Sequence, residues 1–401
     1  MLEKNKPSLR YKEFTDPWEQ KKLGEISEKV TEKNKNNLYY ETLTNSAEFG
    51  IINQREFFDK DISNEKSLHG YYVVRPDDFV YNPRISNLAP VGPINRNNLG
   101  RTGVMSPLYY VFRTHGIDKI FLEKYFSSNK WHKFMWLNGD SGARSDRFSI
   151  KDSVFREMPI PLPQEEEQIK IGNFLKQLDD IIAVSHRKYL KLKQIKKALL
   201  IDMFPSDGSD KPNLRLNGFE DTWKMCQLGE CFSERNERTS EGELLSVTID
   251  SGVVKASSLE RRDSSSEDKS NYKKVNVGDI AYNSMRMWQG ASGVSNYSGI
   301  VSPAYTVITP NTDISSLFFS YQFKLTKMIQ TFEFHSQGLT SDTWNLKYPT
   351  LKNIEVLVPS YEEQIKIGSF FKQLDDTISL QYRKYEKITR IKKALIQDIF
   401  V

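Results

Sequence analysis

EEQIKIGNFLKQLDD, residues 166–180, returns almost unchanged as EEQIKIGSFFKQLDD at residues 362–376. The similarity extends to Phe204 and Phe400, and 25 of the 39 aligned positions are identical. The same offset aligns GARSDRFSIKDSVFREMPIPLP (142–163) with GLTSDTWNLKYPTLKNIEVLVP (338–359). Earlier in each half, LRYKEFTDPWEQKKLGE (9–25) matches LRLNGFEDTWKMCQLGE (214–230). The chain is therefore a tandem repeat whose two halves share their ends and differ in their middles.

The positions of the repeats divide the 401 residues into segments. We expect a first domain at residues 1–160, a long helix at 161–204, a second domain at 214–358 and a second long helix at 359–401. Between the halves, PSDGSDKPN (205–213) combines the turn-forming residues Pro, Gly, Ser and Asp and is expected to be a linker.

Both repeated ends carry apolar residues at a spacing of about 3.5, flanked by Lys, Arg, Asp and Glu, which predicts long amphipathic helices. Such a stripe could pack against the chain's own domains or form a homodimeric coil. Because the chain holds two similar stripes, we expect them to pair with each other as an antiparallel coiled coil. The expected packing residues are Ile171, Leu175, Leu178, Ile182, Tyr189, Leu192, Leu199, Ile367, Phe371, Leu374, Ile378, Tyr385, Ile388 and Leu395.

The two middles contain short strand-like runs separated by turns, together with helix-like segments. YYVVRPDDFVYN (71–82) and YKKVNVGDIAYN (272–283) are typical of strands that lead into a loop, and LYYVFRT (108–114) and AYTVITP (304–310) of strands that leave one. The predicted fold class is therefore mixed α/β (α+β), with two tandem domains that are each followed by a long helix.

The loop regions of the two middles are unusual in charge. No Asp or Glu occurs between Asp78 and Asp118, or between Asp279 and Asp313. Absence of carboxylates avoids repulsion from DNA phosphates, and Arg, Asn and Gln make bidentate contacts to base edges. A second polar loop pair follows at 139–147 and 335–343. Ordinary surface loops would have a similar composition, and this alternative stays open.

We predict a DNA-contacting surface in each half. In the first half its candidate residues are Asn82, Arg84, Asn95, Arg96, Asn97, Arg101, Arg144 and Arg147. In the second half they are Asn283, Ser284, Arg286, Trp288, Gln289, Asn296, Thr340, Ser341 and Thr343.

The sequence offers few features of an enzyme. Five histidines form no metal-spaced pair, and Cys226 and Cys231 lack the second Cys or His pair of a zinc site. Neither a Walker A sequence nor GxGxxG is present. We therefore expect no catalytic residues, no metal and no cofactor on this chain. The low cysteine content and the lack of a secretion signal or a membrane-length apolar run favour a cytoplasmic protein that does not contact membranes.

The duplicated ends and divergent middles together resemble HsdS, the specificity subunit of type I restriction–modification systems, over nearly the whole chain. The most specific matches are W-x4-LGE (Trp18–Glu25 and Trp223–Glu230) and P-x2-EEQ-x3-G-x5-LDD (Pro163–Asp180 and Pro359–Asp376). The resemblance implies a non-catalytic subunit of an N6-adenine methyltransferase and ATP-dependent endonuclease. Its middles would be target-recognition domains that each read one half of a split double-stranded DNA target, and its helices would space them.

The resemblance also implies partners for the chain. Two methyltransferase subunits would bind around the helices and two motor-nuclease subunits would join them, so that S-adenosylmethionine, ATP and Mg are expected on the partner subunits. The alternative is a coiled-coil scaffold or adaptor that organises protein partners without reading DNA.

Overall fold

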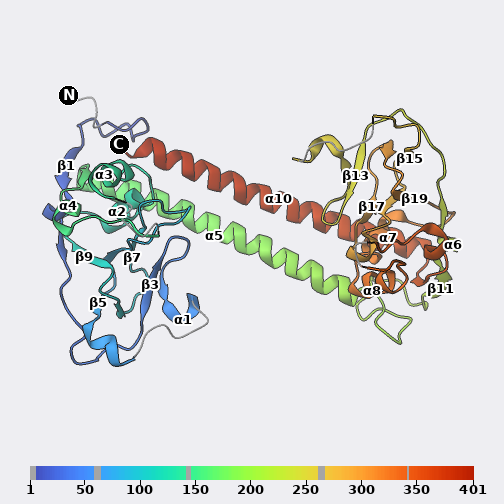
Figure 1. Ribbon diagram of the computed structural model, residues 1–401, viewed down its shortest axis with the longest axis horizontal. Coiled ribbons are helices and arrows are strands. Elements are labelled where there is room, and N and C mark those ends of the chain that lie inside the picture. Colours follow the sequence, from blue (N-terminus) through green and yellow to red (C-terminus); the bar gives the residue numbers. More distant parts are fainter. Residues whose placement is uncertain (1–5, 58–64, 141–145, 261–266, 341–342) are drawn as a thin grey trace. The chain divides into compact units, whose positions relative to one another are not determined.

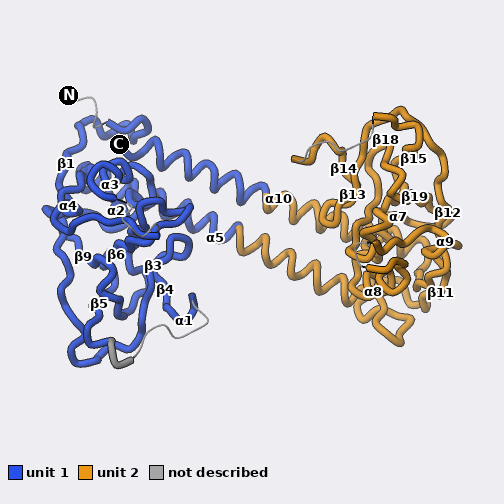
Figure 2. Tube along the Cα trace, viewed as in Figure 1, with its two compact units in different colours: residues 1–185, 383–401 blue, residues 186–382 orange. Residues whose placement is uncertain are grey.

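The structure is a computed structural model that describes residues 6–57, 65–140, 146–260, 267–340 and 343–401. The chain divides into two units (Figure 2). Unit 1 comprises Met1–Ser185 and Arg383–Val401, and unit 2 comprises His186–Tyr382. The division runs through both long helices, α5 (Glu165–Asp202) and α10 (Tyr361–Ile399), so that each unit contains one domain and a part of each long helix (Figure 1).

The domain of unit 1 is built from antiparallel strands. Its main sheet has the order β2-β9-β6-β7, and three strand pairs accompany it. The sheet strands are β2 (Ser27–Lys29), β9 (Tyr110–Thr114), β6 (Phe79–Tyr81) and β7 (Ile94–Arg96). The pairs are β3 (Leu43–Ser46) with β4 (Gly50–Asn53), β5 (Tyr72–Val74) with β8 (Gly103–Met105), and β1 (Glu19–Lys22) with β10 (Pro159–Leu162).

Short helices accompany this sheet, and most of them contribute side chains to its aromatic core. They are α1 (Gln54–Phe57), α2 (Lys119–Phe126), α3 (His132–Asn138) and α4 (Asp152–Phe155), with 3-10 turns at η2 (Leu23–Glu25) and η3 (Glu65–Gly70). Phe79 and Phe112 of the sheet stack at 5.5 Å between ring centroids, and Phe126 of α2 meets both rings edge-on. The core continues into α5 through Ile171 and Leu175.

Unit 2 repeats this architecture with different side chains. Its main sheet has the equivalent order β12-β19-β16-β17, again with three accompanying pairs. The sheet strands are β12 (Phe232–Glu234), β19 (Tyr305–Pro310), β16 (Ile280–Asn283) and β17 (Ser292–Val294). The pairs are β13 (Leu245–Thr248) with β14 (Gly252–Lys255), β15 (Lys273–Val275) with β18 (Gly299–Val301), and β11 (Lys224–Gln227) with β20 (Glu355–Val358).

The helices of unit 2 occupy the equivalent places along the chain. They are α6 (Leu228–Cys231), α7 (Ser316–Gln322), α8 (Thr326–Phe334) and α9 (Tyr348–Leu351), with η4 (Ala256–Ser258) and η5 (Met287–Gln289). The predicted fold class, two tandem mixed domains each followed by a long helix, is confirmed. Within the residues that the structure describes, no helix is long and apolar enough to cross a membrane.

The repeated Glu of the EEQ motif forms a buried ion pair in each unit. Arg10 Nε and Nη2 donate to the two carboxylate oxygens of Glu167 at 2.7 and 2.8 Å, and Glu167 is fully buried. Arg215 binds Glu363 in the same bidentate way, at 2.8 Å for both bonds. The repeated LR at the start of each half is therefore repeated because it supplies the partner of the repeated Glu.

The repeated Gln ties each domain to its long helix. Gln168 Oε1 accepts from the backbone N–H of Asp118 at 2.8 Å, and Gln364 Oε1 accepts from that of Ser315 at 2.9 Å. Asp118 and Ser315 are the N-cap residues of α2 and α7. A Cβ added at Gly172 would lie 3.0 Å from the backbone N of Phe121, in the first turn of α2. The repeated Gln and Gly thus allow α5 to pack closely against α2, and α10 to pack closely against α7.

The repeated LDD and IKKAL segments are partners of each other. In unit 1, the carboxylate of Asp179 on α5 binds Lys392 on α10 and Lys124 on α2. In unit 2, Asp375 on α10 binds Lys196 on α5, with 2.6 Å between Oδ1 and Nζ. The helix parts within each unit therefore run antiparallel, each LDD meeting the Lys of the other copy.

Every residue of the predicted packing stripe is at least half-buried. Ile171, Leu175, Ile367 and Phe371 are buried, and the other predicted members are half-buried. The end of α10 enters the core of unit 1, where the Phe400 ring lies 5.4 Å from that of Phe121. Phe204, after α5, stacks at the equivalent place in unit 2, 5.4 Å from Phe318. α5 begins at Glu165 rather than at the predicted residue 161, because Pro159–Leu162 form β10.

Candidate nucleic-acid interface

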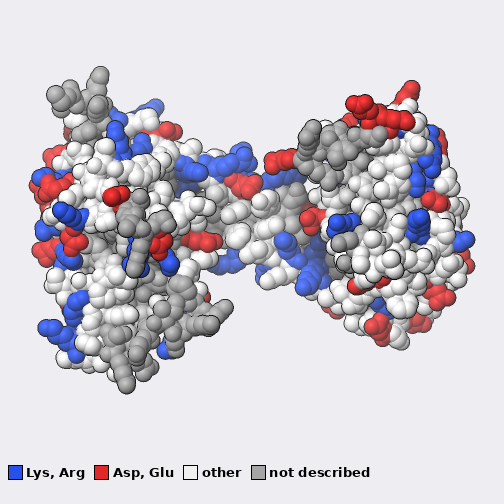
Figure 3. Space-filling model, viewed as in Figure 1, with Lys and Arg blue, Asp and Glu red and all other residues white. Residues whose placement is uncertain are grey.

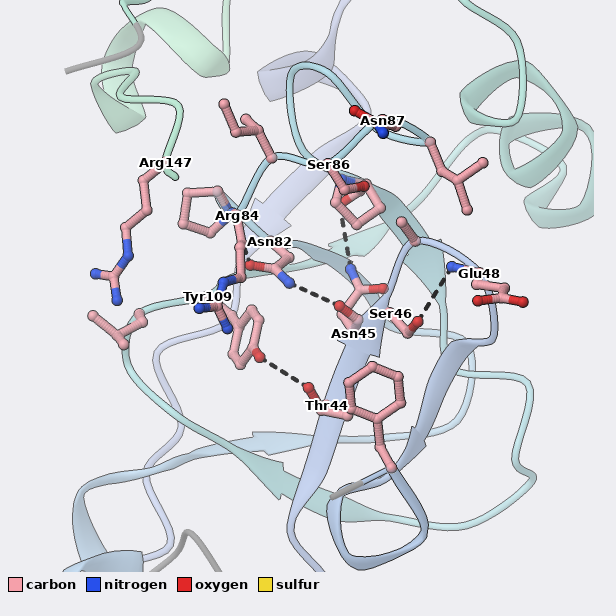
Figure 4. Close-up of a pocket in the computed structure, with 17 residues that line it drawn as sticks. Thr44, Asn45, Ser46, Glu48, Asn82, Arg84, Ser86, Asn87, Tyr109 and Arg147 are labelled. Atoms are coloured by element: carbon pink, nitrogen blue, oxygen red, sulfur yellow. Dashed lines mark hydrogen bonds between the residues drawn. The ribbon is translucent and has the colours of Figure 1, made fainter. Parts of the chain in front are cut away.

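In unit 1, loop 82–93 leaves β6 and returns to β7 beside an open cavity of about 580 Å³. Ser86 and Ala89 close a turn in this loop through reciprocal backbone hydrogen bonds of 3.0 and 3.1 Å, and Asn87 and Leu88 are exposed at its tip. Figure 4 shows polar side chains around the cavity, with Arg84 and Arg147 toward one side and Asn87 and Glu48 toward the other.

Three of the predicted residues line this cavity: Asn82, Arg84 and Arg147. Two backbone hydrogen bonds bring the segments that carry these residues together. The N–H of Ile85 donates to Asp146 O at 3.0 Å, and the N–H of Phe148 donates to Pro83 O at 2.7 Å. Loop 82–93 therefore lies directly beside residues 146–148. Arg84 is exposed, and its Nη2 lies 3.8 Å from a carboxylate oxygen of Asp146. At this distance the ion pair is weak, which leaves the guanidinium available to a phosphate or a base edge.

The structure places four other predicted residues outside the cavity lining, where they bind within the domain. Arg96 binds Asp77 at 2.8 Å and Glu123 at 2.7 Å. Arg101 binds both carboxylate oxygens of Glu41 at 2.7 Å, and this pairing raises the pKa of the guanidinium and lowers the pKa of Glu41. Asn97 is buried and donates to the carbonyl oxygens of Arg75 and Arg101 at 3.0 Å. Asn95 binds Asn45 beneath the loop.

In unit 2, residues 283–290 form the equivalent loop, and its conformation is stabilised by internal bonds. Asn283 Oδ1 accepts from the Met285 N–H at 3.1 Å, as Asn82 Oδ1 accepts from Arg84 N–H at 3.0 Å. Exposed Arg286 donates to Gln289 at 3.2 Å, and Gly290 ends η5 with a positive φ of 81°. Ser284 is buried, with its hydroxyl 2.8 Å from that of Thr306.

The second polar loop of unit 2 also lies against the first. Trp288 and Trp344 meet edge to face at 5.2 Å between ring centroids, and the Leu346 N–H donates to Ser284 O at 2.8 Å. Thr340 and Thr343 are exposed on this loop and bound to each other through Thr343 Oγ1 and Thr340 O at 2.9 Å. Asn296 is exposed in the turn after β17. The predicted residues Arg144 and Ser341 lie outside the described residues.

Several cavity residues were not among the predicted set. Asn87 and Tyr109 lie in the acid-free stretch, where composition pointed to them without distinguishing them from their neighbours. Thr44, Asn45 and Ser46 come from β3, outside that stretch. These three are consecutive polar residues, and all of them are buried. A strand with one face in solvent would expose every second side chain, so the burial of all three indicates that they have polar partners.

Basic side chains also gather on the long helices, where Figure 3 shows Lys and Arg in blue on the face in view. No Asp or Glu occurs between Asp180 and Asp202, while this segment holds one Arg and five Lys.

Within the described residues, no group of three or more His, Cys, Asp or Glu could hold a metal ion. Burial raises the pKa of the Cys231 thiol to about 12, so this cysteine stays protonated.

Comparison with known proteins agrees with this architecture. The family model described as "type I restriction modification DNA specificity domain" matches residues 15–194 and again residues 220–390. A type I restriction–modification S subunit from M. genitalium is 14% identical, with a TM-score of 0.59, over 98% of this chain and 99% of that one. A chain from a study of complex assembly and conformational transition of the type I R-M system is 14% identical, with a TM-score of 0.50, over 97% and 99%.

The HsdS subunit from Thermoanaerobacter tengcongensis is 15% identical, over 96% of this chain and 97% of that one, with a TM-score of 0.47. The two family-model matches together span most of the sequence, one in each repeat. The resemblance predicted from the W-x4-LGE and EEQ motifs is thereby confirmed. The chain belongs to the type I restriction–modification DNA specificity family, whose members are the non-catalytic subunits that give these complexes their DNA sequence specificity.

Proposed function

We propose that each unit reads one half of a split double-stranded DNA target and that the two long helices set the spacing between the halves. One observation carries this proposal: the two units have the same strand order but present different side chains on equivalent loops. Two readers built on one scaffold can recognise two different sequences. The scaffold alternative, without DNA reading, is not favoured by a family match that covers both domains.

The loop chemistry of the two units supports different contacts with DNA. In unit 1, Arg84 and Arg147 beside the cavity can bind phosphates or guanine, and Asn87 at the loop tip suits adenine. In unit 2, Arg286 and Gln289 extend from a loop that the Trp288–Trp344 contact supports. The half-sites are therefore expected to differ, which makes the whole target asymmetric.

A repeated exposed surface on the helices supports the proposal of two methyltransferase subunits. Ile169 and Ile365 occupy equivalent positions and are both 42% exposed. Two further equivalent pairs are exposed in the same way: Val184 with Leu380, and Ile195 with Ile391. Because the apolar residues recur in both copies, two identical partners can bind one chain. These partners would carry S-adenosylmethionine, and two motor-nuclease subunits would carry ATP and Mg, in the cytoplasm where the DNA lies.

The proposal is tested by expressing this chain with its methyltransferase subunit and mapping methylated adenines across the host DNA. We expect one split motif with two defined halves and an undefined spacer. Replacing residues 214–358 with the second domain of another family member should change one half of the motif and leave the other unchanged. Methylation without sequence preference, or a domain exchange that alters both halves, would contradict it.

A further inference from the structure

Loop 82–93 of unit 1 is attached to its domain by an amide network below the cavity. Asn82 N–H donates to Pro93 O at 3.0 Å and closes the stem of the loop. Gly92 has a φ of +85°, and a Cβ there would lie 2.1 Å from Asn82 O, so the two stem strands meet too closely for any other residue. The tip of the loop is exposed while its stem is buried or half-buried.

Asn45 of β3 lies at the centre of this network, with only 1% of its surface exposed. Its Nδ2 donates to Val80 O at 2.7 Å and to Pro93 O at 3.3 Å, which are the carbonyl oxygens on the two sides of the stem. Its Oδ1 accepts from Asn95 Nδ2 at 2.7 Å, and its backbone O accepts from Asn82 Nδ2 at 2.8 Å. One buried side chain and its own carbonyl thus bind both ends of the loop.

Of the two units, only unit 1 has the asparagines of this network at the equivalent positions. Asn45 pairs with Ile51 in the β3–β4 hairpin, and Val247 pairs with Val253 at the same register of β13–β14. Asn95 corresponds to Gly293, because each directly follows the strand partner of an equivalent tyrosine. Ile94 pairs with Tyr81 in unit 1, and Ser292 pairs with Tyr282 in unit 2. Unit 2 therefore has Val and Gly where unit 1 has two asparagines, and there Gly293 packs directly against Gly252.

Unit 2 supports its loop from another direction. Lys324, between α7 and α8, donates from Nζ to the carbonyl oxygens of Gly290 and Ile249. Gly290 is the last residue of loop 283–290. The two units thus use different residues for the same task, an amide pair in one and a lysine in the other.

From this geometry we propose that Asn45 is the positioning residue for DNA reading by unit 1: it holds loop 82–93 in the conformation that presents Arg84 and Asn87 to the half-site. Asn45 itself is too buried to touch a base. Its effect is on the orientation of the exposed residues, because a loop held in one conformation loses less entropy on binding and rejects a wrong base more strongly. The inference rests on the proposed function of the unit.

The test compares the complex of the full chain and its methyltransferase subunit with complexes carrying Asn45→Val or the pair Asn45→Val with Asn95→Gly, which copies unit 2. Binding is measured to the target found by methylation mapping and to duplexes with single base changes in each half. We expect discrimination in the half read by unit 1 to fall roughly tenfold, with discrimination in the other half and the salt dependence unchanged.

Asn34→Val is the matched control. Asn34 is another buried asparagine of unit 1, 3% exposed, and it binds the backbone of Tyr39 outside the cavity lining. Both variants should lower the midpoint of thermal unfolding, and only the Asn45 variant should lower discrimination. If both lower stability and neither alters discrimination, Asn45 has a structural role only and the inference is overturned. If Asn45→Val does not fold, Asn95→Ala is measured instead; it removes the bonds from Asn95 Nδ2 to Asn45 Oδ1 and to Ser46 O. A wild-type complex without sequence preference would contradict the proposed function itself.

Discussion

At the scale of single residues, the arginines of unit 1 differ in how strongly carboxylates bind them. Arg84 lies beside the cavity with a weak ion pair at 3.8 Å, whereas Arg101 is bound twice by Glu41 at 2.7 Å. We expect Arg84→Ala to weaken binding of the specific target by ~1–3 kcal/mol if its guanidinium contacts a base. Arg101→Ala should leave specific binding nearly unchanged. Titration of the two variant complexes with target DNA checks this, and equal losses would show that pairing with Glu41 does not remove Arg101 from the interface.

The two tryptophans of the W-x4-LGE motif differ by one hydrogen bond. Trp18 Nε1 donates to the buried carboxylate of Glu167 at 3.2 Å, while the buried Nε1 of Trp223 has no partner among the described residues. Bonds to charged groups contribute about 1.5–3 kcal/mol. Trp18→Phe should therefore reduce the free energy of unfolding by about 2 kcal/mol more than Trp223→Phe, as measured by urea denaturation. The loss of ring volume is the same in both, so equal effects would mean that the bond contributes nothing.

Lys324 introduces a dependence of stability on pH. Burial is the largest cause that lowers the pKa of its ammonium to about 8, opposed in part by Asp250. Below pH 8 the group is charged in both states, and the cost of burying the charge is fully present. Between pH 8 and its ordinary pKa of 10.5 only the unfolded chain holds the proton, so stability rises with pH, by at most ~1.4 kcal/mol per unit. Urea denaturation from pH 7 to 10 should show this increment in the wild type and lack it in Lys324→Met; identical pH profiles would contradict it.

At the scale of elements, α5 and α10 are joined by ion pairs between residues of the repeated segments. Lys196 and Asp375 join α5 to α10 in unit 2, and their side chains are 25% and 37% exposed. Because solvent screens such a pair, we expect a coupling energy of about 0.5–1 kcal/mol in a double-mutant cycle with Lys196→Ala and Asp375→Ala. Unfolding free energies of the four proteins give the value. Additive effects would show that the pair orients the helices without stabilising them.

The long helices were predictable because their signal is local. A stripe such as Ile171, Leu175 and Leu178 repeats along one element, and its meaning does not depend on the rest of the chain. The loop residues lack this property. Arg101 lies in an acid-free stretch, yet its partner Glu41 is 60 positions earlier in the chain. Asn45 reaches loop 82–93 from a separate hairpin. Local composition indicated a polar surface, but long-range contacts decide which of its side chains are bound within the domain.

At the scale of the whole molecule, the proposed function makes the spacing of the target depend on helix length. Each unit has its own interhelical ion pair: Asp179 with Lys392 in unit 1, and Lys196 with Asp375 in unit 2. His186 and Tyr382 are equivalent positions that lie between these pairs in the sequence. A heptad inserted after each of them preserves both pairs and the apolar stripe. It lengthens each helix by ~10 Å, which corresponds to about three base pairs of DNA at ~3.4 Å each.

Under the proposed function, the variant with both heptads should methylate a target whose spacer is about three base pairs longer, with the bases of both halves unchanged. Methylation mapping in cells that express the variant with its methyltransferase subunit measures the spacer and the halves together. The control inserts the same heptad into the linker at residues 205–213, which lies outside both helices and should leave the spacer as it was. A change in the bases read, or a spacer that responds to the linker and not to the helices, would rule out helix length as the determinant of spacing.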